Sequence, residues 1–231
     1  MKTLGIIGGL GPESTIDYYR LIIEAYRERT KDDSYPPMII NSLDLKRIIR
    51  LMEAQDYASV ADIMVAEIEK LASAGAEFGL ISSNTPHIVF DQIRERAAIP
   101  LISIVEATCE SARAQGLTKL GLFGSGFTMK ARFYPDIFSR NGISVVMPEP
   151  DEQAYIHEKY MDELVKGIFL PETRAKLLDI VDRMKMQNGI EGLILGGTEL
   201  PLILRDAPDC GIPFLDTARI HVNAAVQELL S

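Results

Sequence analysis

The chain has 231 residues, of which 47% are hydrophobic and 25% are charged. This composition is typical of a globular protein, and the length allows two domains of about 100 residues each. The net charge of −9 comes without a basic stripe, and no apolar run approaches the roughly 20 residues of a membrane helix, so we expect neither nucleic acid nor a membrane as a partner.

Apolar runs that end at glycine or at small polar residues alternate along the chain with segments of helical spacing. From the N-terminus the pattern predicts strands at residues 3–8, 38–42, 78–82 and 100–104, and helices at 14–29, 60–74 and 88–96. It continues with strands at 120–123, 144–147, 193–195 and 214–215, and helices at 106–115, 130–140, 151–165, 172–187, 201–206 and 217–230. This alternation indicates an α/β protein with parallel sheets covered by helices.

The sequence also repeats itself at a nearly constant offset. Residues 2–9 resemble 118–125, residues 75–77 resemble 189–191, and residues 98–101 resemble 211–214. Three matches in one order predict two pseudosymmetric three-layer αβα domains, the first formed by residues 1–104 plus 211–231 and the second by 105–210. We expect a ligand cleft between them, lined by the carboxyl ends of the strands.

The two cysteines, Cys109 and Cys210, lack the spacing of a metal or redox motif. We therefore predict reduced thiols in a cytoplasmic protein, with no bound metal. Met1 leads directly into the first predicted strand, so no signal peptide is expected.

The first candidate site is the glycine turn at residues 8–14, after the first strand. Gly9 would let the backbone approach a ligand, and the helix that follows would offer N–H groups to an anion. The turn lacks the glycine spacing of a dinucleotide-binding loop, and it lacks the lysine of the phosphate-binding loop found in nucleoside triphosphatases. A tight turn without a ligand is the alternative.

The second candidate site follows the third strand, at residues 82–87. Ser83, Asn84 and Thr85 carry the hydroxyl and amide groups that suit a carboxylate ligand. A helix cap would need only one of them, so we expect substrate contact. His87 is either an acid-base group or a structural hydrogen-bonding histidine.

The repeat places two further candidates at equivalent strand ends in the second half. Gly197, Thr198 and Glu199 follow the strand at 193–195, and Glu199 is either a base or a charge near a helix N-terminus. Ser125 and Thr128 follow the strand at 120–123 and mirror the first glycine turn.

Three basic side chains are candidates for pairing with a substrate carboxylate: Arg47, Arg50 and Lys166. Long basic side chains on amphipathic helices usually face water, so solvated surface charges are the alternative.

Over nearly its full length the chain resembles the aspartate/glutamate racemase family of amino-acid racemases, on the motifs at 8–15, 83–87, 124–129 and 196–201. The resemblance implies a small-molecule amino-acid or dicarboxylate ligand, a homodimer, and no pyridoxal phosphate or metal. It also implies that Gly9, Asn84, Thr85, Ser125, Thr128 and Thr198 hold the substrate, and that Lys166 matches a substrate-binding lysine.

In that family one cysteine from each half removes or delivers the Cα proton, each on its own face of the substrate. By position these cysteines would stand at residues 83 and 197, where this chain has Ser83 and Gly197. Neither Cys109 nor Cys210 lies in a family motif. A serine is a poor base without an activating neighbour, so we predict that the two-thiol mechanism does not operate here.

The sequence thus favours an isomerase acting on an acidic or small polar amino acid, with a non-cysteine acid-base pair. His87, Glu199 or an ordered water would transfer the proton, and Ser83 would serve as a hydrogen-bond relay. Two alternatives remain: an inactive protein that binds an amino acid or dicarboxylate, and a one-base decarboxylase or isomerase.

Overall fold

The computed structural model describes residues 1–231 except 32 and 206–209. The described chain divides into two compact units, one formed by Met1–Ala107 with Ala218–Ser231 and the other by Thr108–Thr217. The sequence repeat predicts residues 211–217 in the first domain, but they belong to the second unit, because the strand at Phe214–Asp216 pairs with that unit's sheet. Residues 105–107, predicted in the second domain, belong to the first unit.

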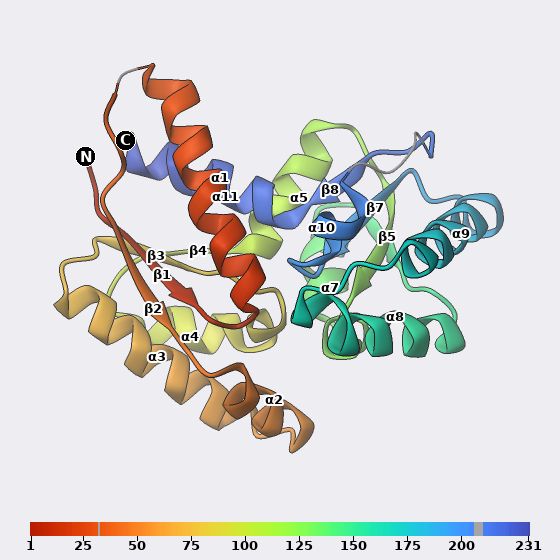
Figure 1. The fold of residues 1–231 in the computed structure, drawn as a ribbon, viewed down its shortest axis with the longest axis horizontal. Coiled ribbons are helices and arrows are strands. Elements are labelled where there is room, and N and C mark those ends of the chain that lie inside the picture. The colour runs from red at the N-terminus through yellow and green to blue at the C-terminus, as the bar shows by residue number, and fades with distance from the viewer. Residues whose placement is uncertain (32, 206–209) are drawn as a thin grey trace. The chain divides into compact units, whose positions relative to one another are not determined.

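The first unit is a parallel four-stranded sheet with helices on both faces (Figure 1). Its strand order is β2-β1-β3-β4. In chain order its elements are β1 (Leu4–Gly8), α1 (Pro12–Thr30), β2 (Met38–Ser42), α2 (Leu45–Glu53), α3 (Tyr57–Ser73), β3 (Phe78–Ile81), the 3-10 helix η1 (Thr85–Val89), α4 (Phe90–Arg96), β4 (Leu101–Ile102), the start of α5 (Ile104–Ala114) and most of α11 (Thr217–Leu229).

Strand β1 lies in the middle of this sheet and all of its residues are buried. Leu4 and Ile6 pack with α1 and α11, and burial of one such side chain contributes roughly 1.5–3 kcal/mol. On the opposite face, a Cβ at Gly5 would lie 2.9 Å from the Cβ of Ala76 and 3.2 Å from that of Leu71, so glycine lets the end of α3 pack closely. The sheet is therefore fixed from both sides, which holds its strand ends in place.

The second unit has the same strand order, β6-β5-β7-β8, and its strands are also parallel. Its elements are the rest of α5, β5 (Lys119–Gly124), α6 (Gly126–Lys130), α7 (Phe133–Arg140), β6 (Ser144–Val146), α8 (Pro150–Asp162), the 3-10 helix η2 (Leu164–Lys166), α9 (Pro171–Asn188), β7 (Gly192–Gly196), α10 (Leu200–Leu204) and β8 (Phe214–Asp216). Two sheets with identical strand order confirm the α/β class that the repeat predicts.

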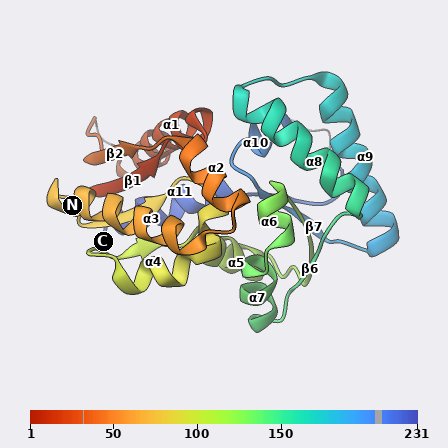
Figure 2. The same ribbon diagram turned by 90° about the horizontal axis from the view of Figure 1, so that it is seen from below.

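The main core of the second unit lies between its sheet and the helices α8, α9 and α10. Phe123 and Leu193 from the sheet pack there with Ile156, Leu177 and Leu200. Figure 2 shows α8 and α9 on one side of this sheet and α5 and α7 on the other. Helix α8 begins with Pro150 behind a reciprocal cap formed by Glu149 and Glu152, which fixes its start.

Several elements differ from the sequence prediction. The helices predicted at 88–96 and 151–165 each include a separate 3-10 turn, η1 and η2. The sequence analysis gave no helix at 45–53, where Asp44 caps α2 by accepting a hydrogen bond from the Lys46 N–H at 3.0 Å. The helix predicted at 130–140 is two helices, because Ala131 has extended backbone angles. The strand predicted at 100–104 is only Leu101–Ile102, since α5 begins at Ile104. Residue 206, the end of another predicted helix, lies outside the described residues.

Across residues 1–31, 33–205 and 210–231, no helix is long and apolar enough to cross a membrane.

Candidate functional site at the strand ends

Strand β3 ends at Ile81, and the segment that follows is held by His87. The Ile104 N–H at the start of α5 donates to Nε2 of His87 at 3.3 Å. Nδ1 therefore carries the proton and donates to the Ser83 carbonyl at 3.0 Å. His87 thus ties the segment after β3 to the segment after β4 and fixes the backbone of Ser83.

The surroundings of His87 keep its ring neutral. Burial, followed by the neighbouring His221 ring, lowers the pKa of His87 to about 3. His221 donates from Nε2 to the Ile102 carbonyl and accepts at Nδ1 from the Tyr18 hydroxyl, both at 2.9 Å. Burial lowers the pKa of His221 to about 4. Both ring nitrogens of His87 hydrogen-bond to backbone groups, which favours a structural role for His87 over an acid-base role.

Ser83 and Asn84 are buried where β3 gives way to η1, and Thr85 is half-buried at the start of η1. Asn84 stands just before η1 and its carbonyl accepts a hydrogen bond from the His87 N–H at 3.0 Å. Three of the predicted polar residues therefore follow one strand end, with the backbone of one of them held by a buried histidine. Their contact with a substrate stays a prediction.

Gly9 has a left-handed backbone, with φ at +76°. A Cβ there would lie 2.6 Å from the Ser42 hydroxyl and would also clash with the Leu43 backbone. The Gly9 N–H donates to the Thr15 hydroxyl at 2.9 Å, so it is engaged within the protein. Glycine is required here by the close approach of the chain after β2, which favours the tight-turn alternative.

Arg47 and Arg50 lie on α2, and both line a surface hollow of about 400 Å³ together with Ser59 and Asp62. Asp62 pairs with Arg96 at 2.7 Å. The two predicted arginines therefore share one hollow of the first unit.

Lys166, in contrast, lies in η2 of the second unit. Its Nζ forms an exposed ion pair with Asp162 at 3.0 Å. This arrangement favours a solvated surface charge, and the substrate-binding role stays a prediction.

In the second unit, Ser125 and Thr128 are buried after β5, where Ser125 caps α6 and Thr128 lies within it. The Ser125 hydroxyl accepts a hydrogen bond from the Thr128 N–H, and the two hydroxyl oxygens lie 3.3 Å apart. Next to them, the Gly126 N–H donates to Nδ1 of His157 on α8 at 3.0 Å. Helix α8 is thus attached to the end of β5.

The end of β7 carries a buried carboxylate. Glu199 is fully buried, and its Oε2 accepts hydrogen bonds from the Tyr160 hydroxyl and, at 3.1 Å, from the Thr198 hydroxyl. Burial and the Glu199 charge raise the pKa of Tyr160 well above its ordinary value, so the phenol keeps its proton. The pair places a strong hydrogen bond at the strand end.

Tyr160 also occupies the space beside Gly197. A Cβ at Gly197 would lie 3.0 Å from the Tyr160 Cζ, 3.1 Å from its hydroxyl oxygen and closer still to Cε2. Sequence reasoning missed Tyr160, which sits in a predicted helix with no motif around it. The available signal was Gly197 itself, since a glycine in place of an expected side chain suggests that another group fills the space.

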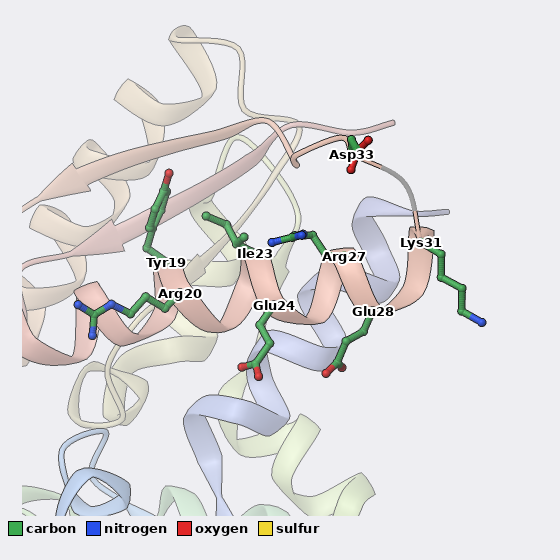
Figure 3. A pocket seen from close by; sticks show the side chains of 8 residues that line it. All are labelled: Tyr19, Arg20, Ile23, Glu24, Arg27, Glu28, Lys31 and Asp33. Carbon is green, nitrogen blue, oxygen red and sulfur yellow. The ribbon is translucent and has the colours of Figure 1, made fainter.

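A larger surface hollow, of about 670 Å³, lies along α1 and contains none of the predicted residues. Figure 3 shows Tyr19, Ile23 and Arg27 on one side of α1 and Glu24 and Glu28 on the other. Charges of both signs line this hollow, so it does not select one class of ligand. Within the described part of the chain, no group of three or more histidine, cysteine or acidic residues could hold a metal ion.

Comparison with known proteins identifies relatives of the whole chain. The model of the family Asp/Glu/Hydantoin racemase matches residues 7–225. A broad specificity amino-acid racemase of Bacillus subtilis (strain 168) is 23% identical over 235 residues, which cover 99% of this chain and 98% of that protein.

Solved structures agree along the full length. The crystal structure of a proposed Asp/Glu racemase from Yersinia pestis has 32% identity and a TM-score of 0.90, and that of an aspartate racemase homologue from Pyrococcus horikoshii OT3 has 33% identity and a TM-score of 0.85. Each comparison covers 100% of both chains. The chain therefore belongs to the Asp/Glu/Hydantoin racemase family, and its relatives support an isomerase of the amino-acid racemase type.

Proposed function

We propose that this protein is a cofactor-independent amino-acid racemase or epimerase that acts on an acidic or small polar amino acid without a cysteine pair. The observation that carries the proposal is Glu199, a buried carboxylate at the end of β7 that two hydroxyl groups hold in place. Racemisation removes the Cα proton and returns one to the opposite face, so it needs a positioned base. The carboxyl ends of parallel strands are where ligands bind in such folds.

The substrate would be held by short polar side chains and by close backbone approach. Asn84 and Thr85 in the first unit, and Ser125, Thr128 and Thr198 in the second, offer hydroxyl and amide groups for the carboxylate and ammonium of an amino acid. Gly9 would allow the backbone to approach, whereas the space beside Gly197 is filled by Tyr160. Arg47, Arg50 and Lys166 would pair with a carboxylate.

The acid-base pair would consist of one group from each unit. Glu199 acts for the second unit. In the first unit the Ser83 hydroxyl relays the proton between Cα and an ordered water, which accepts it in one direction and supplies it in the other, because a serine alone is too weak a base. His87 supports this role by fixing the Ser83 backbone rather than by exchanging protons itself.

The test is a panel of L- and D-amino acids incubated in D₂O with the purified protein, without pyridoxal phosphate and after dialysis against EDTA. We expect deuterium at Cα and appearance of the opposite enantiomer for aspartate, glutamate or a small polar amino acid. Absence of exchange above a heat-inactivated control across the panel would refute the proposal.

A second candidate function is a binding protein without turnover. It is favoured because both ring nitrogens of His87 hydrogen-bond to backbone groups and because Gly197 has no side chain. Such a protein would be stabilised by about 2.7 kcal/mol at a ligand concentration of 100 times Kd. Ligand-dependent thermal stabilisation with no exchange at Cα would support this candidate, and exchange that Glu199→Gln abolishes would reject it.

A homodimer and a cytoplasmic location belong to the same proposal. The first rests on the family resemblance and the second on the use of cysteine. Light scattering of the purified protein tests the dimer, and cell fractionation tests the location.

A further inference from the structure

Helix α8 sends two side chains into the strand-end turns of the second unit. His157 contacts the turn after β5, where a Cβ at Gly126 would lie 3.0 Å from the imidazole Cγ. Tyr160 contacts the turn after β7, where a Cβ at Gly197 would lie 3.1 Å from the phenol oxygen. Each turn has a glycine at the point of contact, so α8 supplies the side chains that the turns themselves lack.

These two contacts fix the position of the Tyr160 ring. The Gly126 N–H bond to His157 holds α8 at one point, and Ile156 anchors the same helix in the core. The Tyr160 hydroxyl then donates to Glu199, which Thr198 also holds. A phenol that only filled space would need no carboxylate behind it, and burial of a carboxylate is costly even when hydrogen bonds offset part of the cost.

We propose that Tyr160 is the catalytic residue of the second unit and exchanges the Cα proton on one face of the substrate, with Glu199 as the proton reservoir behind it. This proposal rests on the racemase function proposed above. When the Tyr160 oxygen takes the proton from Cα, its own hydroxyl proton moves to Oε2 of Glu199. The C–H electron pair stays on the substrate and delocalises into its carboxylate group.

Reprotonation on this face runs the same transfers backwards. Glu199 returns its proton to the Tyr160 oxygen as the hydroxyl proton moves to Cα. Tyr160 is a neutral phenol before and after each transfer, so no buried phenolate has to form as a stable species. The carboxylate alone changes its charge state.

The test uses Tyr160→Phe, which removes the hydroxyl and keeps the ring. Tyr155→Phe is the matched control, because Tyr155 lies on the same helix, its ring packs against the edge of the core and beside Lys159, and it makes neither of the strand-end contacts described for His157 and Tyr160. Cα exchange with D₂O is measured separately for the two enantiomers of the substrate, together with ligand affinity and thermal unfolding.

We expect Tyr160→Phe to slow exchange of one enantiomer by about 100-fold or more, with the other enantiomer much less affected and the ligand affinity changed by less than about threefold. Tyr155→Phe exchanges both enantiomers at the wild-type rate. Glu199→Gln still accepts the Tyr160 hydrogen bond but cannot store a proton, so it shows the same one-sided loss. If Tyr160→Phe fails to fold, wild-type exchange of both enantiomers by Glu199→Gln refutes the inference.

The outcomes separate the two proposals. Wild-type protein without any exchange refutes the racemase function, and this inference with it. Wild-type exchange that Tyr160→Phe leaves unchanged, or reduces equally for both enantiomers, refutes the inference alone and leaves Tyr160 as a packing residue.

Discussion

The ends of β3 and β7 are equivalent by sequence repeat and by strand order, yet they are built differently. After β3 the polar side chains follow the strand directly, and a buried neutral histidine holds their backbone. After β7 there is a glycine, and the buried polar groups are a carboxylate from the turn and a phenol from α8. One sheet edge is thus organised by backbone hydrogen bonds and the other by a side-chain pair.

This difference shows that the same fold allows a buried polar group at a strand end to come from different elements. At the end of β7 the strand itself supplies only Gly197, and a helix from elsewhere in the unit fills the gap. At the end of β3 the group that could react, Ser83, is on the strand end itself. The predictions below separate these two designs, starting with the largest expected effect.

Acid should unfold the first unit before the second. The pKa values of buried His87 and His221 are lowered to about 3 and about 4, whereas the unfolded chain has the ordinary value of about 6.5. Between these values the unfolded state binds more protons, so stability falls as pH falls below about 6.5. The loss is roughly 1.4 kcal/mol per pH unit for each histidine, or about 4 kcal/mol at pH 5.

Hydrogen exchange of backbone amides between pH 7 and pH 4.5 measures this effect for each unit. Amides of β1 and β3 should lose protection first. If those of β5 and β7 open first, the acid sensitivity has another origin.

Replacement of His87 by alanine should destabilise the protein by about 3 kcal/mol. The change leaves the Ile104 N–H and the Ser83 carbonyl without their buried partner and creates a cavity. His157→Ala is the control, because His157 is only half-buried and should cost clearly less. Urea unfolding measures both, and equal effects of the two substitutions would contradict the organising role of His87.

Gly197→Ala should cost about 2 kcal/mol, because the new methyl group meets the ring of Tyr160. In a Tyr160→Ala background the same substitution should cost much less, since the ring is gone. Thermal unfolding of the four proteins of this cycle gives the coupling energy. Additive effects would show that residues 160 and 197 do not share space.

Lys166→Ala should change stability by less than about 0.5 kcal/mol, because its ion pair with Asp162 is exposed. If Lys166 binds substrate as the resemblance implies, Lys166→Ala should raise KM without changing the temperature of thermal unfolding. A KM equal to that of wild type would leave Lys166 as a surface charge.

Sequence reasoning reached the fold because its signals are periodic or local. Apolar strands that end in glycines, and helices between them, define parallel sheets whatever the tertiary details, and the offset of the repeat predicts two similar sheets. Helix α2 was not predicted, because it is short and its buried apolar stripe consists only of Ile48 and Met52. The seven residues at the second domain boundary were misassigned because pairing of β8 with β7 is a long-range contact.

The candidate site was predicted by position and not by contact. Glu199 and the polar residues after β3 stand at strand ends, which the order of elements alone places. The His87 ring is held by a hydrogen bond from the Ile104 N–H, and the space beside Gly197 is filled by Tyr160 from another helix. The sequence does not identify either partner, because both relations depend on how helices pack against the sheet, and Gly197 indicates only that some other group fills its space.

The most direct test of the account compares Ser83→Ala with Glu199→Gln, measuring deuterium incorporation at Cα for each enantiomer of the same substrate. If each unit serves one face, the two variants lose exchange of opposite enantiomers. Loss of the same enantiomer in both variants, or full exchange in either of them, would contradict a division of proton transfer between the two strand ends.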